Sequence, residues 1–231
     1  MLLMDVKTFE DFTDQDLRYR VFTDKDLSSA VFTRANLKHA KFIRTKLTFS
    51  NFNYADLKYA NLENANLSGS STLNYANLSR ANLSRANFKD ADFRGAHLKR
   101  ANLKRANLTR ANLSGAKFQD ANLSGANLTG ASANLSGANL TGANLSGAKF
   151  QDANLSGAKF QDANLSGANL TGANISGAKF QYANIRGADL RGANLRGANL
   201  IRANLRDANL RGANISGAKF QDALTYNTIW S

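Results

Sequence analysis

The chain has 231 residues, of which 43% are hydrophobic, and a formal net charge of +13, with no proline and no cysteine. The lack of cysteine excludes a disulfide framework, a thiolate metal site and a thiol nucleophile. The excess of positive charge favours an acidic partner, such as nucleic acid, an anionic surface or an acidic protein.

The beginning of the chain, MLLMDVKTFEDF, carries Asp5 and has too short an apolar run for a signal peptide. Nowhere does the sequence approach the roughly eighteen consecutive apolar residues that a membrane-spanning helix needs. We therefore expect a protein without a membrane span, located in the cytoplasm.

A five-residue period runs through almost the whole chain, and residues 148–167 read AKFQDANLSGAKFQDANLSG. On an α-helix, five residues advance the chain by about 500°, which would spread the recurring Ala and Leu or Phe over every side. In an extended segment Ala148 and Phe150 share a face, but the next Ala, three residues on, would point away. Only a bend in every period keeps both positions inside, so the sequence predicts a solenoid of stacked coils with a corner every five residues.

The tandem pattern A-(N/D)-(L/F)-x-x resembles the pentapeptide repeat family over roughly residues 10 to 222. The resemblance implies an all-β fold, a right-handed quadrilateral β-helix with four repeats, or about twenty residues, per coil. Corner geometry alone would permit other closures. On this count the chain forms one domain over residues 1–231, with about ten coils and a length near 50 Å at an interstrand spacing of ~4.8 Å.

Forty-two repeats can be placed, with central residues at 12 to 67, 73 to 128 and 135 to 220 in steps of five. Ala stands two residues before the centre in 35 of the 42 repeats, and 12 of the 14 Phe lie at centres. At twenty residues per coil, Phe12, Phe32 and Phe52 are predicted to stack in one column, with Phe22 and Phe42 in the opposite one. All 17 Gly lie two residues after a centre, where a type II turn favours glycine.

Residues 1–30 keep the period but replace the inward Ala by Glu10, Gln15, Arg20 and Lys25. Charged residues on an open edge discourage end-to-end strand pairing, so we expect this segment to cap the N-terminal end. Residues 31–222 are predicted to form the regular coils. Residues 223–231 are predicted to form the C-terminal cap, with Ile229 and Trp230 covering the last coil.

Two outward columns in the first coils combine positive charge with aromatic rings. Bases can stack on aromatic rings while phosphates meet cations, so the two columns are a candidate nucleic-acid or partner surface. Aromatic residues at corners can also serve only to cover the backbone of the neighbouring coil. The columns consist of Arg18, Lys38 and Lys58, beside Tyr19, His39 and Tyr59.

The period is interrupted twice, by a step of six residues near 68–72 and a step of seven near 129–134. One or two extra residues fit in a bulged corner. Each interruption shifts the register, so we expect the columns to hold only within each segment.

Two stretches of the regular coils are strongly basic, residues 80–110 and residues 186–211, and the surface between them is mostly Ser, Thr, Asn and Gln. Such charge can contact an acidic partner, or can serve only solubility. The candidate contact residues in these bands are Arg80, Arg85, Arg100, Arg105, Arg186, Arg191, Arg206 and Arg211.

No catalytic constellation is found in the sequence. His39 and His97 are predicted to point outward nearly three coils apart, too far for one metal ion, and Asp152 and Asp162 lie on opposite faces. The many Asn that precede a centre are interpreted as stacked hydrogen-bonded ladders and not as ligands. We therefore expect no enzyme activity, no cofactor and no metal site.

The first function hypothesis is a non-enzymatic scaffold that binds an unknown protein or other acidic partner through its faces, as a monomer or an end-to-end dimer. The family resemblance implies a second hypothesis, because some members resemble duplex DNA and act on DNA gyrase, as in fluoroquinolone resistance. A net charge of +13 argues against DNA mimicry, although contact with gyrase need not use the whole surface. Direct binding of nucleic acid is a third hypothesis, which follows from the charge alone.

Overall fold

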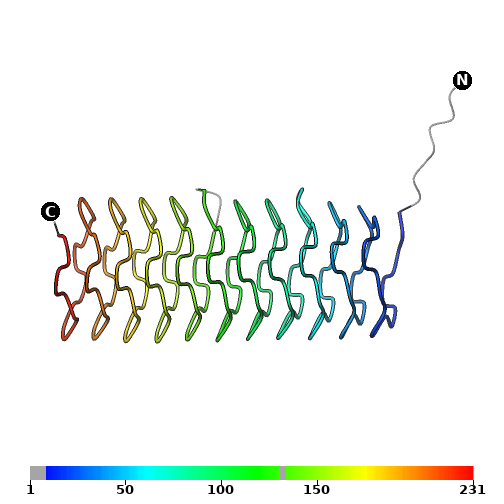
Figure 1. Ribbon diagram of the computed structural model, residues 1–231, viewed down its shortest axis with the longest axis horizontal. Helices are drawn as coiled ribbons and strands as arrows, with labels where there is room; N and C mark the ends of the chain where they lie inside the picture. The colour runs from blue at the N-terminus through cyan, green and yellow to red at the C-terminus, as the bar shows by residue number, and fades with distance from the viewer. Residues whose placement is uncertain (1–8, 131–133, 231) are drawn as a thin grey trace, which may run out of the picture.

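The computed structural model describes residues 9–130 and 134–230, and in Figure 1 the chain winds into a straight rod of stacked coils. Within the described residues there is no helix and no continuous strand, and hence no helix that could cross a membrane. Single-residue parallel β-bridges join each coil to the next, from Asp11↔Val31 at one end to Asn209↔Ile229 at the other. The parallel β-pairing therefore extends from coil to coil along the axis of the rod, with one paired residue per repeat.

The bridges form four columns, which begin at Asp11, Asp16, Val21 and Asp26, and we call the corresponding sides of the rod faces A, B, C and D. The predicted right-handed quadrilateral β-helix is confirmed. The bridge column of face A passes through eleven levels, because residues 214–230 make most of an additional coil beyond the ten expected. Ten spacings of ~4.8 Å give a rod of about 48 Å.

Each repeat uses its backbone donors in the same way, as the repeat around Leu103 shows. The Leu103 N–H donates to the carbonyl oxygen of Asn122 in the next coil at 2.7 Å, and the Asn102 N–H donates to Ala81 in the previous coil at 2.9 Å. The Ala106 N–H donates to the Leu103 carbonyl oxygen at 3.0 Å and closes the corner. Proline would remove one of these donors, which explains its absence from the chain.

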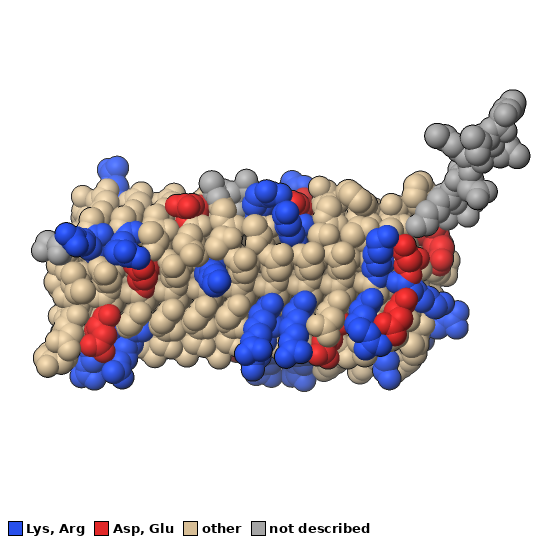
Figure 2. Space-filling model, turned by 45° about the horizontal axis from the view of Figure 1, so that its top comes forward, with Lys and Arg blue, Asp and Glu red and all other residues tan. Residues whose placement is uncertain are grey.

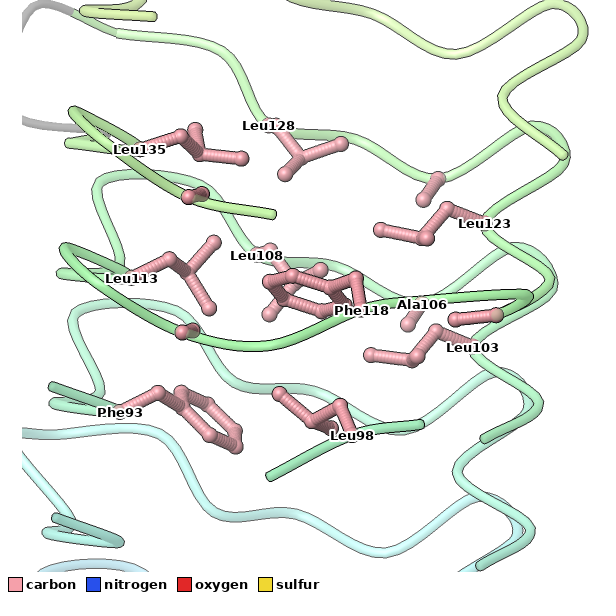
Figure 3. Packing of buried hydrophobic residues seen from close by; sticks show 14 of the residues in the cluster. Phe93, Leu98, Leu103, Ala106, Leu108, Leu113, Phe118, Leu123, Leu128 and Leu135 are labelled. Atoms are coloured by element: carbon pink, nitrogen blue, oxygen red, sulfur yellow. The ribbon is translucent and has the colours of Figure 1, made fainter. Parts of the chain in front are cut away.

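The core is a continuous column of central residues and of the Ala that precede them. In Figure 3 the labelled Phe93, Leu103, Ala106 and Phe118 point into the rod, and all four are at most 1% exposed. Burial of each such Leu or Phe side chain stabilises the folded state by about 1.5 to 3 kcal/mol, before the loss of chain entropy is counted.

The predicted Phe columns are confirmed. Phe32 stacks on Phe12 at 4.8 Å and on Phe52 at 4.6 Å between ring centroids, while Phe22 and Phe42 stack at 4.8 Å on the opposite side. The two columns also meet edge to face, with Phe32 and Phe42 at 5.6 Å and 88°. Both geometries are favourable for aromatic pairs.

The second residue after each centre turns the corner in the left-handed backbone region, whether or not it is glycine. Gly147 has φ of 62° and Arg105 has φ of 57°. Glycine adopts this region without strain, whereas other L-residues lose about 1–2 kcal/mol there. The predicted role of the glycines as corner residues is therefore confirmed, and the non-glycine corners are the strained ones.

We expect Gly147→Ala to lower the free energy of unfolding by about 1 kcal/mol, because a Cβ there would meet open space and only the backbone strain counts. Gly172→Ala should cost about the same, since its Cβ would meet only Oδ1 of the exposed Asp152 side chain, which can rotate away. Urea unfolding of the two variants beside the unchanged protein measures both losses. Equal losses would show that backbone strain alone sets the cost at these corners.

Both interruptions of the period lie at the corner between face D and face A, and the columns continue through them. The bridge partners step by 21 residues at Asn51↔Thr72 and by 22 at Asn112↔Asn134, and all four faces resume the step of 20 afterwards. The expectation that columns hold only within segments was wrong, because the extra residues are absorbed in the corner. Residues 131–133 of the second interruption lie outside the described residues.

The two ends of the rod differ. Glu10, Gln15, Arg20 and Lys25 are exposed at the N-terminal coil. At the other end, Ile229 continues the bridge column of face D instead of folding over the last coil. Trp230, which we expected to cover that coil, packs edge to face on Phe220 at 5.2 Å and is 41% exposed.

Candidate interaction surface

The aromatic column predicted in the first coils exists on face B as a continuous stack. The centroid distance is 4.9 Å both between Tyr19 and His39 and between His39 and Tyr59, with interplanar angles of 9° and 12°. The rings therefore cover one another and present their edges to solvent. Stacking of a nucleic-acid base needs a free ring face, which the His39 ring does not offer.

The cations beside this stack are largely neutralised. The Arg18 guanidinium binds both carboxylate oxygens of Asp16, at 2.6 Å for the shortest contact, and Lys38 Nζ lies 3.2 Å from Asp56. The hydrogen bonds from Arg18 hold the pKa of Asp16 below its usual value. Three further ion pairs lie in the same coils, formed by Arg34 with Asp14, Arg44 with Asp24, and Lys46 with Asp26.

Tyr59 lies beside two cations, Lys58 and Arg80, that have no carboxylate partner among the described residues. The Arg80 guanidinium lies over the Tyr59 ring, 5.6 Å from its centroid, and donates a hydrogen bond to the phenol oxygen at 3.2 Å. Lys58 Nζ lies 5.2 Å from the same centroid. An aromatic ring positions these two cations without neutralising their positive charge, as a carboxylate partner would.

Coils 3 to 5 carry a group of such cations on faces B and C, which we call the basic belt. Among the described residues, its members have no ion-pair partner except Arg100, which lies 3.6 Å from Asp120. In Figure 2, Lys and Arg side chains gather in bands separated by uncharged surface. The belt consists of Lys58, Arg80, Arg85, Lys99, Arg100, Lys104 and Arg105.

The second predicted band is more dispersed. Arg186 pairs with Asp207 at 3.1 Å, and Arg191 with Asp189 at 2.7 Å. Arg206 and Arg211 have no ion-pair partner in the part of the chain that the structure describes, and they belong to different faces, C and D. Among the described residues, this band therefore holds fewer unpaired cations than the basic belt.

The two histidines do not share a site, because His39 lies in coil 2 and His97 in coil 5. Lys117 Nζ lies 3.1 Å from His97 Nε2, so a neutral imidazole accepts a hydrogen bond from the ammonium group. Burial, and then the charge of Lys117, lower the pKa of His97. This contact therefore favours a neutral His97.

The predicted asparagine ladders are confirmed. Asn102 Nδ2 donates to Asn82 Oδ1 at 3.1 Å, and Asn82 Nδ2 donates to Asn61 Oδ1 at 3.2 Å. Asn102 Oδ1 also accepts from the Lys104 N–H at 3.2 Å. The side-chain amide of Asn102 therefore has both its donor and its acceptor group engaged in hydrogen bonds to other residues of the rod.

Sequence reasoning missed the contact between Tyr59 and Arg80, and did not place Lys99 and Lys104 beside these residues. Their columns cross the first interruption, beyond which the columns were not expected to continue. Adding the one extra residue to the step of twenty would have placed Arg80 directly after Tyr59.

The sequence profile described as Pentapeptide repeats matches the chain in eight overlapping copies, and the chain belongs to this family. The family is generally one of non-enzymatic structural repeat proteins. The copies cover residues 11–48, 30–69, 69–100, 96–132, 116–157, 131–167, 153–192 and 188–224.

Solved structures of the same family are similar to the chain. HetL, a pentapeptide repeat protein involved in heterocyst differentiation regulation from the cyanobacterium Nostoc sp. strain PCC 7120, is 33% identical, with 93% of this chain and 90% of HetL covered and a TM-score of 0.43. QnrB1, a plasmid-mediated fluoroquinolone resistance protein, is 19% identical, with 90% of each chain covered and a TM-score of 0.40. Rfr23 from the cyanobacterium Cyanothece 51142 is 26% identical, with 58% and 64% covered and a TM-score of 0.27. The comparison with curated proteins gives no match.

Proposed function

We propose that this protein is a non-enzymatic interaction rod that binds an acidic partner through the basic belt. The observation that carries the proposal is the contrast in pairing along the rod. Among the cations one or two residues after a centre, Arg18, Arg34 and Arg44 in the first coils have carboxylate partners, whereas Arg85 and Arg105 in the belt have none among the described residues. Unpaired cations on a rigid surface attract and orient an acidic partner.

The non-enzymatic part of the proposal rests on how the polar side chains are used. Asparagine side chains bond along the ladders, carboxylates such as Asp90 bond to arginine, and His97 accepts from Lys117. Groups held in this way stabilise the rod and are not free to attack or to transfer protons.

The test compares two double variants with equal charge. Arg85→Glu with Arg105→Glu changes neighbouring belt residues, while Lys159→Glu with Lys179→Glu changes neighbouring exposed residues in the less charged coils, and each lowers the net charge from +13 to +9 (13 − 4 = 9). Partners are captured on the immobilised wild-type rod and then measured with each variant. We expect at least tenfold weaker binding to the belt variant and unchanged binding to the other.

Equal weakening of both variants would show that binding follows net charge alone, which would overturn a role for the belt. Titration of the protein with duplex and single-stranded DNA at rising salt tests nucleic acid as the partner, because contacts to phosphates make the affinity depend steeply on salt. A gyrase supercoiling assay with the wild type and the belt variant tests gyrase as the partner.

A further inference from the structure

A hollow lies in the basic belt on face B, where one short side chain interrupts a column of lysines. Ser79 lies between Lys58 and Lys99, as the hydrogen bonds from the Tyr59 N–H to the Ser79 oxygen, at 3.2 Å, and from the Arg80 N–H to the Lys99 oxygen, at 2.9 Å, show. The hollow has a volume of about 280 Å³. It is lined by Lys58, Tyr59, Ser79, Arg80, Lys99 and Arg100.

This lining has four cations, the two hydroxyl groups of Ser79 and Tyr59, and no carboxylate. Arg80 is held in place by Tyr59 through the ring contact and the hydrogen bond to the phenol oxygen. Only one Nη of Arg80 takes part in that hydrogen bond, so further N–H groups of its guanidinium can donate to a ligand. A guanidinium fixed before binding loses less conformational entropy when an oxyanion arrives.

A second hollow of about 190 Å³ on face C is built from the same sequence pattern. Ser84 and Arg85 correspond to Ser79 and Arg80, since ANLSR is repeated, and Lys104 and Arg105 follow in the next coil as Lys99 and Arg100 do on face B. The differences lie above them, where Glu63 takes the position of Lys58 and Asn64 that of Tyr59. The second hollow therefore contains a carboxylate that opposes anion binding, and it is an internal control for the first.

We propose that the hollow around Ser79 binds a phosphate monoester group, an inference that rests on the proposed binding of an acidic partner and specifies it. A monoester carries a charge of about −1.5 to −2 and three terminal oxygens, which match several converging donors better than the single charge of a carboxylate. Asp56 and Asp120 limit the positive surface along face B on both sides. A phosphodiester backbone that continued along the face would be repelled there, so the site fits one discrete group.

The experiment follows the backbone amides of Ser79 and Ser84 by NMR while short peptides are added at low salt and pH 7.5. The probes are acetyl-Gly-phosphoserine-Gly-amide, the same peptide with glutamate, and inorganic phosphate. We expect saturable shifts at Ser79 and not at Ser84, with a Kd at least tenfold lower for the phosphopeptide than for the glutamate peptide. Tighter binding of the phosphopeptide than of inorganic phosphate would identify a modified partner, and equal binding a free phosphate, while no preference over glutamate would overturn the proposal.

Filling the hollow distinguishes a built site from diffuse charge. Ser79→Lys raises the net charge to +14 (13 + 1 = 14) but occupies the space, so we expect at least fivefold weaker phosphopeptide binding. Ser84→Lys carries the same added charge and should leave the Ser79 response unchanged. Diffuse attraction predicts equal or tighter binding to Ser79→Lys, and that result would overturn the site.

A charge-neutral exchange provides an independent check. Lys58→Glu with Glu63→Lys leaves the net charge at +13 and exchanges the charges above the two hollows. The phosphopeptide response should then weaken at Ser79 and appear at Ser84, and a response that stays at Ser79 would contradict the proposal. If the captured partner still binds Ser79→Lys but not the belt variant, the phosphate site fails while the proposed function stands.

Discussion

Replacing Phe32 by alanine is expected to lower the free energy of unfolding by about 3–5 kcal/mol. The side chain is fully buried and contacts four rings, since it stacks on Phe12 and Phe52 and meets Phe22 and Phe42 edge to face. The rigid coils around it cannot collapse into the space, so the cavity adds to the lost transfer free energy. Urea unfolding followed by circular dichroism measures the effect.

Phe49→Ala is the matched control, because Phe49 is 65% exposed and its loss should cost less than about 1 kcal/mol. Each coil contacts only its neighbours, so hydrogen exchange should show the loss of protection in coils 1 to 3 of the Phe32 variant before the later coils. Similar losses for the two variants would contradict the stacked aromatic core.

The fold could be predicted from sequence because one physical constraint acts in every repeat. A period of five is compatible with an inward Ala and an inward Leu or Phe only if the chain bends once per repeat, and more than forty repeats apply that constraint together. The Phe column of Phe12, Phe32 and Phe52 followed directly from the coil length. The number of repeats per coil came from the family resemblance, since corners alone do not determine it.

The charge distribution could not be predicted in the same way. Whether a cation is free depends on a carboxylate one coil away, as for Arg44 and Asp24, and on the rotamers that bring them together. Arg44 and Arg85 both occupy corner positions of face C, yet only Arg44 has a carboxylate at the neighbouring corner, Asp24. Because of these different environments, we assign the candidate interaction surface to the basic belt and not to the first coils.

The corner residues show how stability and binding are separated in this fold. The inward positions determine stacking and tolerate little variation, whereas a corner such as Arg105 can exchange glycine for a functional side chain at a cost of about 1–2 kcal/mol. The excess stability of a long uniform core offsets that cost. Binding residues can therefore be placed at corners without altering the coils.

Acid is expected to destabilise the rod strongly, and the direction follows from the paired aspartates. Hydrogen bonds from Arg34, Arg44 and Arg110 hold the pKa values of Asp14, Asp24 and Asp90 below 3.8. A group whose pKa is lower in the folded state stabilises that state above its unfolded pKa, and the contribution is lost as the pH falls through the folded pKa. The urea midpoint should therefore fall steadily from about pH 5 to pH 2.5.

Repulsion adds to this loss, since full protonation of the 17 Asp and Glu and of both His raises the net charge from +13 to +32 (30 + 2 = 32). Salt separates the two causes, because at 0.5 M the Debye length is about 4 Å and general repulsion is screened, while hydrogen-bonded pairs persist. Asp90→Asn combined with Arg110→Gln removes one pair without changing the net charge, and its midpoint should depend less on pH than that of the wild type at 0.5 M salt. Identical pH profiles would mean that the Asp90 pair contributes nothing to the acid response.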